Sequence, residues 1–127
     1  MGGIRGCTVG RISEEIVEAA LKRAVDSGKI TGYMKVDGQG YDFSIGLPGQ
    51  IVNALIEVKS SDEGRRVHRI KYGGDTPVII VRHRRTTMLP QERASYISTA
   101  YSQIMIAVNN EMQKRRPTQD APAAITA

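Results

Sequence analysis

The chain has 127 residues, the usual size of a single domain, so we expect one hydrophobic core and one functional site. Hydrophobic residues make up 40% of the chain and charged residues 24%, which excludes a wholly disordered protein and supplies enough apolar side chains for a core. The formal net charge of +5 favours a polyanionic partner over an acidic one.

Two absences in the sequence restrict the cellular setting. The lone Cys7 cannot form an internal disulfide, which favours a reducing compartment. No stretch approaches the roughly 20 apolar residues of a bilayer-spanning helix, and the first residues lack the apolar run of a signal peptide. We therefore expect a cytoplasmic protein that does not associate with membranes.

The two ends differ in composition from the middle of the chain. Residues 1–12 are rich in glycine and are predicted to be a flexible N-terminal segment. Residues 117–127 combine two prolines with small side chains and are predicted to be a disordered tail. The expected domain therefore covers residues 13–116.

The first predicted helix covers Glu14–Ser27. Ser13 can cap its N-terminus, and Gly28 can terminate it in a left-handed conformation. Its apolar residues recur at helical spacing and predict a face that packs on a flat surface: Ile16, Val17, Ala20, Leu21, Ala24 and Val25.

Three strands are predicted to follow this helix. Thr31–Val36 and Tyr41–Ile45 form a hairpin around the turn at Asp37-Gly38. Leu47–Gln50 is a second turn, and Ile51–Lys59 is a third strand whose apolar character predicts a central place in the sheet.

The second half of the chain completes an α/β fold. The basic segment Asp62–Tyr72 can hold a short helix, and Pro77–Arg82 is a fourth strand that a crossover of this length can place parallel to the third. Pro90–Arg116 is a long helix whose apolar stripe serves either the core or a second subunit. The predicted order is α-β-β-β-(α)-β-α, with a mixed central sheet flanked by helices.

Two carboxylates and an ammonium group can meet in this arrangement. Because strand residues alternate between faces, Glu57 and Lys59 lie on one face of the third strand. Antiparallel pairing brings Asp42 of the preceding strand beside Glu57. Two carboxylates suit Mg²⁺, with Mn²⁺ as an alternative, and a lysine beside them can orient or stabilise an attacking hydroxide.

The runs Gly40-Tyr41-Asp42-Phe43 and Ile56-Glu57-Val58-Lys59-Ser60-Ser61 resemble the bipartite signature of the PD-(D/E)xK, or restriction-endonuclease-like, nuclease superfamily. The resemblance covers Ser13 to Arg82. Within the superfamily, the chain looks most similar to archaeal-type Holliday-junction resolvases and to virus-type replication-repair nuclease domains. Tyr41 stands where the signature has proline, and no glutamine follows shortly after Lys59.

The resemblance implies a magnesium-dependent DNA endonuclease of recombination or repair, acting on junctions or branched DNA. It assigns Asp42 and Glu57 to the metal, the Val58 carbonyl to the same metal shell, and Lys59 to the attacking water. The first helix often supplies a further acidic residue in this superfamily. The candidates here are Glu14, Glu15 and Glu18, and we favour Glu15 because it directly precedes the Ile16-Val17 pair. Junction-resolving relatives act as dimers, so a homodimer is implied if the resolvase assignment holds.

Basic residues follow the third and fourth strands and are predicted to contact phosphates, although a solubilising face is the alternative. The predicted nucleic-acid-binding residues are Arg65, Arg66, Arg69, Lys71, Arg82, Arg84 and Arg85. The alternative function is a non-catalytic nucleic-acid-binding or assembly module with the same fold, in which Glu57 and Lys59 form only an ion pair.

Overall fold

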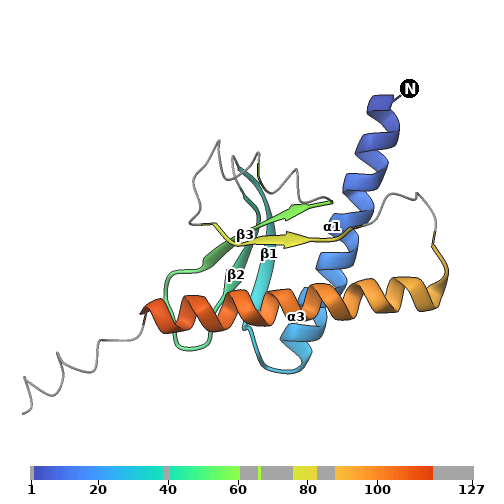
Figure 1. The fold of residues 1–127 in the computed structure, drawn as a ribbon. Helices are drawn as coiled ribbons and strands as arrows, with labels where there is room; N and C mark the ends of the chain where they lie inside the picture. Colours follow the sequence, from blue (N-terminus) through green and yellow to red (C-terminus); the bar gives the residue numbers. More distant parts are fainter. Residues whose placement is uncertain (1, 39–40, 61–65, 67–75, 83–87, 116–127) are drawn as a thin grey trace, which may run out of the picture.

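The computed structural model in Figure 1 describes residues 2–38, 41–60, 66, 76–82 and 88–115. The elements in chain order are α1 (Gly2–Asp26), β1 (Gly32–Gly38), β2 (Tyr41–Gly46), β3 (Ala54–Lys59), β4 (Val78–Ile80) and α3 (Pro90–Arg115). The predicted α/β class and the predicted order of these elements are confirmed. The short helix allowed for in Asp62–Tyr72 falls outside the described residues, apart from Arg66.

The strands form one mixed sheet in the order β1-β2-β3-β4. β1 pairs antiparallel with β2, and β2 pairs antiparallel with β3, as short connections between consecutive strands allow. β4 pairs parallel with β3, with Lys59 opposite Ile80. The predicted interior position of β3 is confirmed, and Ile56, Glu57 and Val58 in this strand are all buried.

Both long helices contribute to one core. The buried face of α1 packs against Phe43, Ile45 and Ile56 of the sheet, and α3 adds Ala100, Ile104 and Val108 to the same cluster. α1 and α3 also contact each other directly, and the Arg23 guanidinium lies 4.4 Å from the centre of the Tyr101 ring. Of the two roles considered for the apolar stripe of α3, the structure shows the contribution to the intramolecular core.

The first helix is longer than predicted at its N-terminus. α1 begins at Gly2, so the backbone of the segment assigned to a flexible lead-in is helical. Ser13 is a buried residue inside the helix and not its N-cap. The prediction relied on the low helix propensity of glycine, which is only a weak local preference. The C-terminal stop was right, because Gly28 has a φ of 74° and its N–H donates to the Val25 carbonyl.

The third strand is shorter than predicted, because Ile51–Asn53 belongs to the preceding connection. Gly49 has a φ of 75°, and the Gln50 N–H closes a turn on the Leu47 carbonyl. Ile51 is fully exposed, and the Arg115 guanidinium donates to the carbonyls of Val52 and Asn53. The apolar character of Ile51 and Val52 misled the prediction, because these side chains face solvent.

The outer edge of β4 is occupied by a side chain of α3. Gln103 accepts a hydrogen bond from the Ile80 N–H at 2.9 Å and donates one to the Ile80 carbonyl at 2.8 Å. The amide therefore makes the two bonds that a neighbouring strand would make. No helix in the described ranges has the length and apolar character needed to cross a bilayer.

Candidate active site

The recorded ladder between β2 and β3 stops just before Asp42 and Glu57, which would form the next pair. Its last recorded pair is Phe43 with Ile56. Beyond it, the Val58 N–H donates to the Asp42 carboxylate at 2.8 Å, with the Glu57 carboxylate as a second acceptor at 3.3 Å. The Asp42 carboxylate therefore accepts the hydrogen bond that a backbone carbonyl of β2 would otherwise accept from Val58. It lies between the ends of β2 and β3.

The backbone of β3 directs further polar atoms toward this opening. The Glu57 N–H donates to the Pro77 carbonyl, and the Lys59 carbonyl accepts from Val81, so both residues bond toward β4. Neighbouring residues of a strand direct their N–H and C=O groups to opposite sides. The Val58 carbonyl therefore points to the β2 side, where Asp42 binds the Val58 N–H.

Asp42 and Glu57 form a coupled pair of carboxyl groups. Their side chains share a hydrogen bond, and Glu57 is only 7% exposed. Burial raises the pKa of Glu57 from 4.5 to about 8, and the hydrogen bond and negative charge of Asp42 add to this effect. These effects favour the protonated form of Glu57 at neutral pH.

Lys59 lies on the same face of β3 as Glu57, as the alternation of strand residues requires. Its positive charge lowers the pKa of Glu57 and so partly opposes the effects of burial and of Asp42. The structure thus brings together Asp42, Glu57, Lys59 and the Val58 backbone, which the sequence placed at one site.

Glu15 is not brought to this pair. Its side chain is exposed and has no hydrogen bond or ion pair within the described part of the chain. Its neighbours on α1 face β1 instead, where Glu14 lies 3.5 Å from the Lys35 ammonium and Glu18 accepts from Tyr33 at 3.1 Å. Within the described ranges, no group of three His, Cys, Asp or Glu side chains could hold a metal ion.

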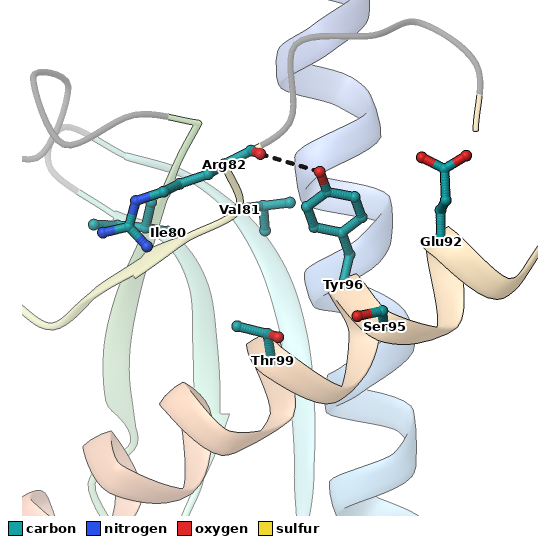
Figure 2. A pocket seen from close by; sticks show the side chains of 7 residues that line it. All are labelled: Ile80, Val81, Arg82, Glu92, Ser95, Tyr96 and Thr99. Atoms are coloured by element: carbon teal, nitrogen blue, oxygen red, sulfur yellow. Dashed lines mark hydrogen bonds between the residues drawn. The ribbon is translucent and has the colours of Figure 1, made fainter. Parts of the chain in front are cut away.

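Of the predicted nucleic-acid-binding residues, two are described, and both Arg66 and Arg82 are exposed. Arg82 directly follows Val81, and its side chain extends beside that of Ile80 in Figure 2. Because Ile80 pairs with Lys59, Arg82 continues from the strand that borders the candidate site. The structure does not describe the remaining five, which are Arg65, Arg69, Lys71, Arg84 and Arg85. The predicted tail, residues 117–127, also lies outside the described residues.

A pocket that the sequence analysis did not predict lies where β4 meets the first half of α3 (Figure 2). Its volume is about 390 Å³, and its lining consists of Ile80, Val81, Arg82, Glu92, Ser95, Tyr96 and Thr99. The Tyr96 hydroxyl donates to the Arg82 carbonyl at 3.2 Å across this pocket. The spacing of the four α3 residues was a usable signal, because it places them on one helix face.

No family model, curated protein or solved structure matches this chain. Comparison with known proteins therefore assigns neither a family nor a function. The functional conclusion depends on the motif residues and on the geometry that brings them together.

Proposed function

We propose that this protein is a metal-dependent endonuclease of the PD-(D/E)xK type that hydrolyses phosphodiester bonds of DNA. The observation that supports it is the meeting of Asp42 and Glu57 at the open end of the β2–β3 ladder. Lys59 lies on the same strand face, and the Val58 carbonyl points to the same opening. Asp42, Glu57 and Lys59 occupy the acidic and lysine positions of the nuclease signature, and Tyr41 replaces its proline.

The donor atoms of this site fit Mg²⁺. Mg²⁺ binds through one or two carboxylates and retains several waters, and it accepts hard oxygen donors such as carboxylates and carbonyls. Asp42 and Glu57 supply the carboxylates, and the Val58 carbonyl is available on the same side. Burial, and to a smaller extent Asp42, raises the pKa of Glu57, and a bound cation would act in the opposite direction by favouring the ionised carboxylate.

Each residue has a separate role in the proposed reaction. A bound Mg²⁺ would lower the pKa of a coordinated water and offset negative charge on the phosphate. Asp42 and Glu57 would hold the cation as carboxylates, and the Lys59 ammonium would orient and stabilise the attacking hydroxide. Arg66 and Arg82 bind neighbouring phosphates of the DNA. Glu15 keeps its proposed assisting role only as a prediction from the family resemblance.

Branched or junction DNA is the proposed substrate class, and recombination or repair is the proposed setting. Two symmetric cuts across a junction need two sites, so the resolvase form of the proposal includes a homodimer.

The test is cleavage of four substrates: a labelled four-way junction, a flap, linear duplex and single strands. Each is incubated with Mg²⁺, Mn²⁺ or EDTA. We expect metal-dependent cutting that Glu57→Ala and Asp42→Ala abolish, because each variant removes one of the two carboxylate ligands. Asp26→Ala is the control, since this carboxylate is exposed at the far end of α1. Undiminished cutting by either site variant would overturn the proposal.

A non-catalytic nucleic-acid-binding or assembly module on the same fold is the second candidate. The burial of Glu57 favours it, as does the absence of a third acidic ligand among the described side chains. This candidate predicts salt-sensitive DNA binding, no cutting of any substrate, and DNA binding that is the same in Mg²⁺ and in EDTA.

A further inference from the structure

The face of α3 that is turned toward β4 is polar, although the helix packs beside a sheet. Glu92, Ser95, Tyr96 and Thr99 follow the spacing i, i+3, i+4, i+7 and so share one face of the helix. Gln103 continues this face and bonds to Ile80 of β4, which fixes the direction in which the face points.

Core packing accounts for only part of this face. Tyr96 is partly buried against the core cluster to which Ala100, Ile104 and Val108 of α3 belong, whereas Ser95 and Thr99 are exposed. Between the polar face and β4 the chain leaves a pocket of about 390 Å³. Small-molecule sites have volumes of roughly 300–1,000 Å³, with an apolar lining and a few converging polar groups.

We propose that this pocket binds one unpaired nucleotide of the nucleic-acid substrate, next to the phosphodiester bond that the candidate active site cuts. The position beside a scissile bond rests on the proposed nuclease function. The nucleotide-binding chemistry of the pocket stands independently of it.

The lining matches the parts of a nucleotide. Tyr96 is partly buried against the core and offers the remainder of its ring to a base, and its hydroxyl bond to the Arg82 carbonyl fixes the ring across the pocket (Figure 2). The Glu92 carboxylate, which also accepts a hydrogen bond from the Leu89 N–H at 3.2 Å, can accept from base N–H groups. The Ser95 and Thr99 hydroxyls can donate or accept, and the Arg82 guanidinium suits a phosphate.

The pocket adjoins the candidate active site through one pair of strands. Ile80 lines the pocket and is the ladder partner of Lys59. Adjacent strands lie about 4.8 Å apart, and ligands of open α/β sheets bind beyond the carboxyl ends of the parallel strands. A DNA strand that passes the carboxyl pair can therefore place its neighbouring base in the pocket. A base can enter only if it is unpaired, so the pocket selects for single-stranded or branched DNA over continuous duplex.

The binding test uses the metal-free full chain in EDTA, titrated with each of the four deoxynucleoside 5′-monophosphates and followed by two-dimensional NMR. Thr99→Leu fills the pocket from an exposed position without removing core atoms. Ser98→Leu is the matched control, because Ser98 is exposed on the same helix but does not line the pocket. We expect saturable binding of at least one nucleotide, weakened at least tenfold by Thr99→Leu and unchanged by Ser98→Leu.

Two results would overturn the proposal: no saturable binding of any of the four nucleotides, or equal affinities for wild type and Thr99→Leu. The outcome is separable from that of the nuclease proposal. If no DNA is cut but nucleotide binding depends on Thr99, the pocket stands and the nuclease proposal falls. If cutting depends on Glu57 but Thr99→Leu leaves nucleotide affinity unchanged, the nuclease proposal stands and the pocket proposal falls.

Discussion

Replacing Glu57 by glutamine should stabilise the metal-free protein, and the gain should grow with pH. In the folded chain the pKa of Glu57 is about 8, compared with 4.5 for an ordinary glutamate. Protonation of Glu57 therefore stabilises the wild-type fold fully below about pH 4.5, and this contribution is lost as the pH rises through 8. Glu57→Gln keeps a side chain that can form hydrogen bonds and removes the charge.

The expected gain in unfolding free energy of Glu57→Gln follows from the pKa shift of Glu57. Each pKa unit corresponds to about 1.4 kcal/mol, which puts the upper limit for a shift from 4.5 to about 8 near ~5 kcal/mol. Asp42 is only half-buried, so solvent can relax around the ionised pair, and we expect about half of this limit, ~2–3 kcal/mol. For urea slopes of about 1–3 kcal/mol per molar, this equals a midpoint difference of roughly 0.7–3 M.

The assay is urea unfolding of wild type and Glu57→Gln in EDTA at pH 5 and pH 8, followed by circular dichroism. The advantage of the variant should be small at pH 5 and large at pH 8. Asp26→Asn is the control, because this exposed carboxylate has no contact with the pair. A stability difference between Glu57→Gln and wild type that is the same at both pH values would refute the coupling between burial, Asp42 and the Glu57 proton.

Four further outcomes are expected. Mg²⁺ should raise the melting temperature of wild type more at pH 8 than at pH 6, because protons compete for the same carboxylates at the lower pH. It should not stabilise Asp42→Ala. Calorimetry at both pH values checks these two expectations. Gln103→Ala should cost about 1–3 kcal/mol of unfolding free energy in urea titrations, because it leaves the Ile80 N–H and carbonyl without their partner. Phe43→Ala should cost about 3–5 kcal/mol in the same titrations, since Phe43 is fully buried. Gly49→Ala should cost about 1 kcal/mol, because the φ of 75° strains any residue with a Cβ, and a cost near zero would contradict the turn geometry.

The elements that the sequence predicted well are those with a long periodic pattern or a defined stop. The apolar spacing of α3 and the glycine at position 28 located helix ends correctly at Arg115 and Asp26, within a residue. Strand alternation and one hairpin were enough to place Asp42 beside Glu57 and to put Lys59 on the face of Glu57. These relations depend on local geometry, which a single sequence carries.

The remaining features depend on contacts between distant segments. Ile51 and Val52 have the composition of a strand, and nothing near them in sequence shows that Arg115 holds their segment in a loop. The burial of Glu57, and therefore its raised pKa, depends on which chain segments cover it. The pocket between β4 and α3 is lined by residues from both segments, so it could not be predicted until the two were placed against each other.

The amide of Gln103 makes the two borders of the sheet unequal. On β4, the backbone groups of Ile80 that face outward are already engaged, so an incoming strand would have to displace a side chain that forms two hydrogen bonds. Among the described strands, β1 has no such occupant on its outer side. A strand added from another molecule would therefore meet less competition at β1 than at β4, and a single glutamine on a helix contributes to this asymmetry.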